Sequence, residues 1–182
     1  MKTKANRVEL IIGGARSGKS SFAEQVAKES KKFVTYIATS QVYDDEMAKR
    51  VEKHRVQRPA GWKVVEEPIE LAQALKKYSR KENCILVDCL TLWLSNCMFS
   101  QDYREWDPIK QEFLALLNSL PGQVVLVTNE IGCGVVPMGK ETRRFVDEAG
   151  ELHQAIAKRA ARVTLVTAGL PLVLKGERYE MA

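Results

Sequence analysis

A glycine-rich segment near the start of the chain has the residues and the spacing of a phosphate-binding loop. The apolar run Val8–Ile12 leads into G-G-A-R-S-G-K-S at residues 13–20, which fits the P-loop pattern G-x-x-x-x-G-K-[S/T]. Glycines let a ligand approach the backbone, and successive N–H groups at a helix N-terminus attract phosphate. We expect Lys19 to reach the β- and γ-phosphates of a nucleoside triphosphate and the Ser20 hydroxyl to ligate Mg²⁺. The loop expected to surround the phosphates comprises Gly13, Gly14, Ala15, Arg16, Ser17, Gly18, Lys19 and Ser20.

Two further apolar runs end in carboxylates. Cys84–Val87 is followed by Asp88, and in P-loop proteins an aspartate at such a strand end holds or orients Mg²⁺ beside the triphosphate. A strand-end turn is the alternative for Asp88, and the P-loop favours the magnesium role. Val124–Thr128 is followed by Asn129 and Glu130. Glu130 is compatible with binding a metal, activating a hydroxyl group or capping the loop, and these alternatives stay open.

Both histidines of the chain lie in predicted helices. In residues 44–58, Met47, Val51 and His54 share one helix face, and lysines and arginines crowd the C-terminal end. On the pattern alone, a half-buried structural histidine is favoured over one that works on phosphates. His153 lies beside the apolar stripe of a predicted helix over 140–161, where packing or exposure is expected rather than catalysis.

Short β-branched runs alternate with helical segments along the chain. The predicted strands are Val8–Ile12, Phe33–Ala38, Cys84–Val87, Val124–Thr128 and Val163–Thr167. Such apolar strands are typical of an α/β fold with a mostly parallel central sheet, helices on both faces and ligands at the carboxyl ends of the strands. Residues 168–175 are predicted to be a loop that returns over the sheet. Gly150, inside the late helix, suggests close packing or the approach of a ligand.

Length and composition restrict the class of protein. The 182 residues, 45% hydrophobic and 28% charged, predict a single domain over 1–182 of a soluble protein. No apolar run is long enough to span a bilayer and the N-terminus does not resemble a signal peptide, so a cytoplasmic protein is expected. The net charge of +5 is spread along the chain without a basic block, which argues against a nucleic-acid partner. The four cysteines form no CxxC pair, so free thiols are expected: Cys84, Cys89, Cys97 and Cys133.

Several motifs together resemble one family, the bifunctional adenosylcobinamide kinase/adenosylcobinamide-phosphate guanylyltransferases of cobalamin biosynthesis. The resemblance covers nearly the whole chain. The P-loop alone indicates only a superfamily, whereas H-R-x-x-R-P-x-x-W at 54–62 and N-E-I-G-x-G-V-V-P at 129–137 are far more specific. Supporting motifs are Y-I-A-T-S at 36–40, V-D-C-L-T-L-W-L at 87–94 and A-G-L-P at 168–171.

The resemblance implies particular site residues. It makes His54 the histidine that becomes guanylylated, and Lys19, from the P-loop pattern, is the second predicted catalytic residue. Beyond the P-loop it places nucleotide contacts at Ala38, Thr39, Ser40, Arg55, Val56, Gln57, Arg58, Glu66 and Asp88. It also implies Mg²⁺ held by Ser20 and Asp88, a fold similar to recombinase-type ATPases, and a homotrimer.

Two reactions are implied by the same resemblance. ATP or GTP phosphorylates adenosylcobinamide, and GMP then passes from GTP through His54 to adenosylcobinamide phosphate, giving adenosylcobinamide-GDP and pyrophosphate. One departure concerns the late helix, where the family commonly has L-N-Q and this chain has Leu152-His153-Gln154. The alternatives are a P-loop kinase of another small molecule, with a structural His54, or a non-enzymatic nucleotide-binding regulatory protein.

Overall fold

The computed structural model describes residues 7–41, 59, 61–99 and 105–179, and the structural statements that follow concern these residues. They form one seven-stranded sheet in the order β3-β2-β4-β5-β1-β6-β7. The strands are β1 (Val8–Gly13), β2 (Phe33–Ala38), β3 (Lys63–Glu66), β4 (Asn83–Asp88), β5 (Gln123–Asn129), β6 (Arg162–Thr167) and β7 (Leu170–Lys175). The helices are α1 (Lys19–Glu29), α3 (Leu71–Tyr78), α4 (Leu90–Phe99), α5 (Trp106–Leu117) and α6 (Lys140–Arg159).

The sheet is parallel except at one edge. Neighbouring strands pair in parallel from β3 to β6, and only β7 runs antiparallel, against β6. The central strands β1, β4 and β5 are almost entirely buried, as expected for a parallel sheet that is covered on both faces. The predicted mostly parallel α/β fold is therefore confirmed.

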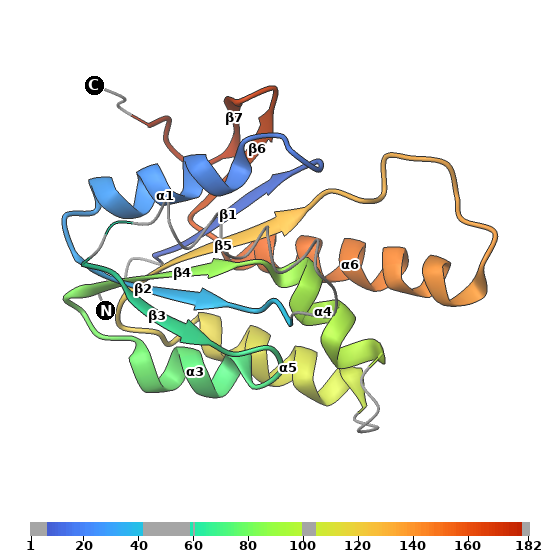
Figure 1. Cartoon of the computed structure of the whole chain (residues 1–182), viewed down its shortest axis with the longest axis horizontal. Coiled ribbons are helices and arrows are strands. Elements are labelled where there is room, and N and C mark those ends of the chain that lie inside the picture. Colours follow the sequence, from blue (N-terminus) through green and yellow to red (C-terminus); the bar gives the residue numbers. More distant parts are fainter. Residues whose placement is uncertain (1–6, 42–58, 60, 100–104, 180–182) are drawn as a thin grey trace.

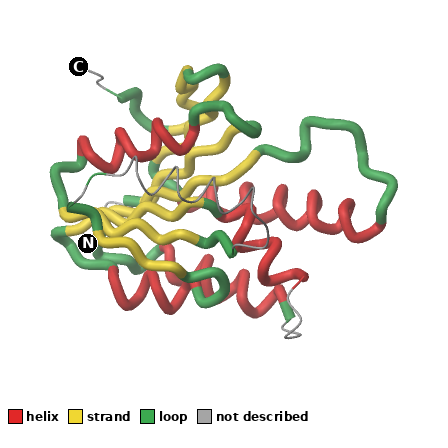
Figure 2. Tube along the Cα trace, viewed as in Figure 1, coloured by secondary structure: helices red, strands yellow, loops and turns green. Residues whose placement is uncertain are grey.

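Helices cover the two faces unequally (Figures 1 and 2). Alternate residues of the strands from β2 to β6 in the sheet belong to two separate apolar clusters, because successive side chains point to opposite faces. On one face Phe22 and Val26 of α1 pack on strand residues such as Val125. On the other face α3, α4, α5 and α6 bury a larger core around Trp93 and Phe113.

The structure differs from the sequence-based predictions at three places. The predicted loop over 168–175 is instead strand β7, because Ala168 and Gly169 (φ 50° and 77°) make a two-residue turn that reverses the chain. Pro171 is tolerated in β7 since this is an edge strand. The exposed strand β3 was not predicted from the sequence. Gly150 is not a site of close protein packing, because a Cβ at this position would have no atom within 4 Å.

Other expectations hold. The predicted helix over 140–161 corresponds to α6, whose buried residues are Ala149, Leu152 and Ile156. All four cysteines are free thiols, three of them buried. None of the helices in the described ranges has the length and apolar character needed to cross a membrane.

Candidate active site

The P-loop joins the carboxyl end of β1 to the first turn of α1. Gly18 caps α1 with φ 93°, in the left-handed region that favours glycine, and its carbonyl accepts the first helical hydrogen bond, from Phe22 N–H at 3.0 Å. The Lys19 ammonium bends back across the loop and donates to the Gly14 carbonyl at 3.2 Å. This places a cation and a helix N-terminus at one point, the arrangement that binds phosphate.

The β6–β7 turn supports the P-loop from the side. The N–H of Gly169 donates to the Ser17 carbonyl at 2.8 Å, and a Cβ on Gly18 would lie 3.0 Å from the Gly169 Cα. On the same side, a Cβ on Gly13 would lie 2.4 Å from the Val166 carbonyl oxygen. The Ser17 hydroxyl is buried without a hydrogen-bond partner in the described structure. The A-G-L-P motif therefore fixes the shape of the P-loop.

Asp88 ends β4, on the same edge of the sheet as the P-loop. Only β5 separates β4 from β1, so the carboxyl ends of the three strands lie side by side (Figure 1). Tyr36 of β2 donates to Asp88 Oδ2 at 3.3 Å. Burial raises the pKa of the neighbouring Cys89 thiol to about 11, and the Asp88 carboxylate also raises it, whereas the Lys19 ammonium lowers it. The Asp88 carboxylate and the Lys19 ammonium therefore both lie close enough to Cys89 to affect its pKa, as groups of one nucleotide and metal site should.

The segment Ala38–Ser40 is held against the start of α4. The Thr39 side chain is fully buried; its hydroxyl donates to the Cys89 carbonyl at 2.7 Å and accepts from Cys89 N–H at 2.9 Å. Asn96 donates to the Thr39 carbonyl at 2.8 Å. Because the Thr39 hydroxyl is already paired twice, it acts on the site through the position of its backbone.

Glu66 lies at the carboxyl end of the edge strand β3, opposite Ala38 in register. The next residue, Glu67, donates its N–H to the Ala38 carbonyl at 2.9 Å, and its carboxylate accepts from the N–H groups of Ile69 and Glu70 at 3.1 and 2.8 Å. These bonds tie β3 to the predicted nucleotide segment of β2. Glu66 is exposed and therefore accessible from solvent.

The carboxyl end of β5 holds a chain of hydrogen bonds. Thr91 Oγ1 accepts from Asn129 N–H at 2.7 Å and lies 3.2 Å from Thr128 Oγ1, which lies 2.8 Å from His153 Nε2. Glu130 donates its N–H to the Gly13 carbonyl at 3.0 Å, and its Oε1 accepts from the N–H groups of Gly132 and Cys133. One Glu130 oxygen therefore caps the following loop, which was one of the three roles considered for Glu130.

Two polar residues at this edge were not predicted from the sequence to be part of the site. Tyr36 sits inside an apolar strand and Thr91 inside an apolar helix, and that contrast is the signal that marks them. His54 and Arg55–Arg58 lie outside the described residues, so their predicted roles stay predictions.

The donors at this edge fit Mg²⁺ held partly by a nucleotide. A hydroxyl on Ser20 and a carboxylate on Asp88 supply the oxygen ligands that Mg²⁺ prefers. Among the residues that the structure describes, no three histidine, cysteine or acidic side chains gather into a metal cage. Mg²⁺ commonly takes only one or two carboxylates and completes its shell with phosphates and water, so this donor set is sufficient.

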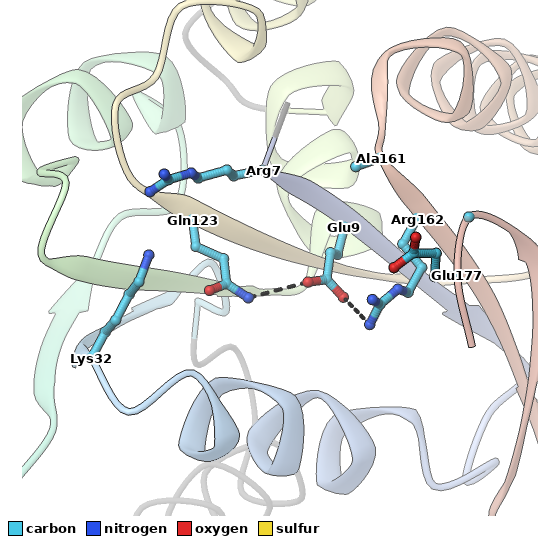
Figure 3. A pocket seen from close by; sticks show the side chains of 8 residues that line it. Arg7, Glu9, Lys32, Gln123, Ala161, Arg162 and Glu177 are labelled. Carbon is cyan, nitrogen blue, oxygen red and sulfur yellow. Dashed lines mark hydrogen bonds and ion pairs between the residues drawn. The ribbon is translucent and has the colours of Figure 1, made fainter. Parts of the chain in front are cut away.

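A polar pocket of about 460 Å³ lies at the opposite edge of the sheet, around the amino-terminal ends of β1, β5 and β6 (Figure 3). Its central carboxylate, Glu9, accepts from Gln123 at 3.1 Å and from Tyr179 at 2.9 Å and pairs with Arg162 at 3.5 Å. Arg7 and Lys32 line its other side. Because its central charges pair with one another and ligands of such sheets bind at the carboxyl edge, we place no substrate here.

Comparison with known proteins agrees with this geometry. Residues 9–174 match the family described as cobinamide kinase / cobinamide phosphate guanyltransferase. The bifunctional adenosylcobalamin biosynthesis protein CobP of Pseudomonas aeruginosa is 53% identical over 169 residues, covering 93% of this chain and 98% of that protein. The bifunctional adenosylcobalamin biosynthesis protein CobU of Escherichia coli is 40% identical over 179 residues, covering 91% and 98%.

Two solved structures resemble the chain in fold alone. A Pyrococcus horikoshii protein superposes with a TM-score of 0.57 at 8% identity, covering 97% of this chain and 90% of that one. The RadB recombinase superposes with a TM-score of 0.52 at 14% identity, covering 88% and 74%. The predicted similarity to recombinase-type ATPases is confirmed at the level of fold.

Proposed function

Because the chain belongs to the cobinamide kinase / cobinamide phosphate guanyltransferase family, we propose which of its residues carry out the two reactions of that family. The chain is a kinase and nucleotidyltransferase of cobalamin biosynthesis. It phosphorylates adenosylcobinamide and then transfers GMP from GTP to adenosylcobinamide phosphate, which gives adenosylcobinamide-GDP and pyrophosphate. A kinase of another small molecule and a non-enzymatic regulatory protein are not favoured.

The kinase step takes place at the P-loop. The observation that carries this proposal is the position of Lys19 and Asp88 at one edge of the sheet, with only β5 between their strands. In phosphoryl transfer the protein mainly positions the groups and stabilises charge on the transferring phosphoryl group. Lys19 and the backbone N–H groups of residues 13–20 hold the β- and γ-phosphates of ATP or GTP. Ser20 and Asp88 would hold Mg²⁺, which supplies positive charge to the phosphates.

His54 performs the guanylyl transfer. The support is its place in H-R-x-x-R-P-x-x-W within a chain that matches the family over residues 9–174. A neutral imidazole attacks the α-phosphorus of GTP, the bond to pyrophosphate breaks, and a histidine–GMP phosphoramidate forms. A phosphate oxygen of adenosylcobinamide phosphate then attacks that phosphorus and releases His54. Arg55 and Arg58 neutralise phosphate charge during both transfers.

Other residues form the remainder of the nucleotide site. The proposed contacts outside the P-loop are Ala38, Thr39, Ser40, Arg55, Val56, Gln57, Arg58, Glu66 and Asp88. We also propose that residues 1–182 act as one domain, in the cytoplasm, as a homotrimer. Light scattering on the purified protein measures the mass of the assembly and so tests the trimer.

The decisive experiment uses GTP labelled at the α-phosphorus and, separately, at the γ-phosphorus. After incubation with protein and Mg²⁺ and then denaturation, we expect acid-labile, base-stable label on the chain from the α-position only. The His54→Asn variant should carry none. Label from the γ-position would instead indicate a phosphohistidine enzyme, and α-label that persists in His54→Asn would move the nucleophile to another residue.

A further inference from the structure

His153 belongs to a hydrogen-bonded chain that crosses three elements. Its Nε2 lies 2.8 Å from the Thr128 hydroxyl of β5, which is completely buried. Thr128 lies 3.2 Å from the Thr91 hydroxyl of α4, and Thr91 accepts the N–H of Asn129 at 2.7 Å. The chain therefore connects α6, the end of β5 and the first turn of α4.

The donors and acceptors of this hydrogen-bonded chain can be arranged so that each group donates toward His153. Thr91 Oγ1 already accepts from Asn129 N–H, and among the described contacts Thr128 is the acceptor available for its hydroxyl proton. When Thr91 donates to Thr128, Thr128 donates its own proton to His153 Nε2, and this arrangement requires a neutral ring with its proton on Nδ1. A protonated ring would donate to Thr128 and reverse the chain, and the Thr91 hydroxyl proton would lose its acceptor. With a neutral ring every hydroxyl proton of these hydrogen bonds stays within the protein, whereas the reversed arrangement leaves the half-buried Thr91 hydroxyl to donate to solvent.

The hydrogen-bonded chain from His153 ends between the P-loop and Asp88, the two parts of the proposed kinase site. Asn129 pairs in register with Gly13, the first residue of the P-loop, and Glu130 N–H donates to the Gly13 carbonyl at 3.0 Å. Thr91 is three residues beyond Asp88. The backbone that Thr91 anchors is thus the backbone that separates the P-loop from Asp88.

We propose that His153 is a positioning residue for phosphoryl transfer: as a neutral acceptor it orients Thr128 and Thr91, which fix the end of β5 between the P-loop and Asp88. This proposal rests on the proposed kinase site at Lys19 and Asp88. A displacement of about 1 Å at such a point costs rate, because catalysis here depends on aligned charges. His153 itself touches no substrate in this scheme.

The charges around the ring are consistent with the neutral form. Burial lowers the pKa of His153 below its usual value of 6.5, and the Glu130 carboxylate partly opposes this. Glu130 is the charged group of the described residues that acts on the ring, and it comes from the loop after β5. The groups that face the ring from β5 and α4 are the uncharged hydroxyls of Thr128 and Thr91.

Nuclear magnetic resonance tests the protonation state without any enzyme assay. The chain has two histidines, so His54→Asn leaves His153 as the one imidazole. Nitrogen-15 spectra of this variant should show a neutral ring protonated on Nδ1, with a pKa below 6.5. A ring protonated on Nε2 at pH 8 would overturn the proposal.

Kinase assays with ATP and adenosylcobinamide test the role. In the His54→Asn background we compare His153 with His153→Gln, whose amide reaches the same place as Nε2 but does not titrate, and with His153→Leu. We expect kcat of the His153 enzyme to fall as the pH is lowered through the pKa of this ring, and kcat of His153→Gln to stay flat. His153→Leu should lose about tenfold in kcat at pH 8, the effect of one lost buried hydrogen bond.

Identical pH profiles for His153 and His153→Gln would overturn the proposal. So would full activity of a folded His153→Leu at pH 8. Should His153→Leu fail to fold, the comparison of His153 with His153→Gln still decides. Lys19→Ala, assayed in parallel, separates the two claims: if it keeps kinase activity, the proposed kinase site itself is wrong.

Discussion

The N–H of Gly169 donates a 2.8 Å hydrogen bond to the carbonyl oxygen of Ser17, and so ties the β6–β7 turn to the P-loop. The two residues are far apart in sequence, and the contact exists because β6 lies beside β1. Gly18 packs on the Cα of Gly169, so a side chain on Gly18 would force the two backbones apart. A turn at the sheet edge is thereby joined to the backbone of the P-loop, which is the proposed phosphate site.

We predict that Gly169→Ala weakens nucleotide binding. Gly169 has φ 77°, where a side chain costs about 1–2 kcal/mol. The turn can relieve that strain by moving, which would stretch the bond to Ser17. Titration calorimetry with GTP should show a Kd several-fold above that of the unmodified chain.

The neighbouring position in the turn supplies the control. Ala168 has φ 50°, so Ala168→Gly should relieve strain and leave both the bond to Ser17 and the Kd unchanged. A Gly169→Ala protein that loses thermal stability but binds GTP normally would show that the turn supports the fold and not the P-loop.

Lys19→Met should abolish the kinase step while the protein stays folded. Among the described residues the Lys19 ammonium makes one hydrogen bond, to the Gly14 carbonyl, so its loss removes little from the folded state. Removing one preorganised charge from a transferring group typically costs about 100-fold or more in kcat. Phosphorylation of adenosylcobinamide is the assay, and circular dichroism checks the fold. Retention of more than a tenth of the activity would contradict the assignment.

Asp88→Asn should raise the Mg²⁺ concentration needed for half-maximal kinase activity. The amide keeps the size of the side chain and can still accept from Tyr36, but it loses the negative charge that attracts the cation. Tyr36→Phe removes only the 3.3 Å bond to Asp88 and is the matched control, with a smaller change expected. A magnesium requirement that is the same for Asp88→Asn and the unmodified chain would exclude Asp88 as a ligand.

Local patterns were sufficient for the elements that carry their own signal. The strand–glycine loop–helix pattern around Lys19 and the apolar run before Asp88 predicted strands β1 and β4 and placed the two residues at the carboxyl ends of these strands, as the structure has them. Burial on both faces makes such strands uniformly apolar, so they are conspicuous in a sequence.

Contacts between distant segments left no comparable local signal. The strand β7 was missed because its turn depends on Ala168 at positive φ, which alanine seldom adopts. The link from His153 to Thr91 depends on how α4, β5 and α6 pack together, and the contrast of Thr91 with its apolar helix does not indicate which residue it contacts. The role of Glu130 stayed open because capping depends on the path of the loop after it.

Lys110 should contribute strongly to the stability of the α5–α6 contact. Its side chain is 9% exposed, and its ammonium lies 2.8 Å from Glu148 and 3.3 Å from Glu151. Burial lowers the pKa of Lys110, but hydrogen bonds to Glu148, Asp107 and Glu151 outweigh it and hold the pKa above its usual value. Lys110→Met leaves Glu148 without its cation, and we expect a loss of about 3 kcal/mol in the free energy of unfolding.

The double variant Lys110→Met/Glu148→Gln should recover part of that loss. A glutamine at 148 carries no unpaired charge and can still accept the bond from Trp106 Nε1, which now measures 2.8 Å. Urea denaturation of the unmodified chain, Lys110→Met, Glu148→Gln and the double variant gives the coupling energy between the two side chains. Strict additivity of the two single changes would mean that the ion pair contributes nothing measurable.

The free energy of unfolding should depend on pH through His153, in a direction set by its lowered pKa. Above about pH 6.5 the ring is neutral in both the folded and the unfolded chain, so it adds no pH dependence. As the pH falls below that value the unfolded chain binds a proton first, because folding lowers the pKa, and stability is lost until the pH reaches the folded pKa. Each pKa unit by which folding lowers the value contributes about 1.4 kcal/mol to this loss. In the His54→Asn background, urea denaturation between pH 8 and pH 5 should therefore show a steeper loss for His153 than for His153→Gln. Carboxylates that titrate in both proteins cancel in the comparison, and parallel curves would mean that the ring is protonated equally easily in the folded and unfolded states.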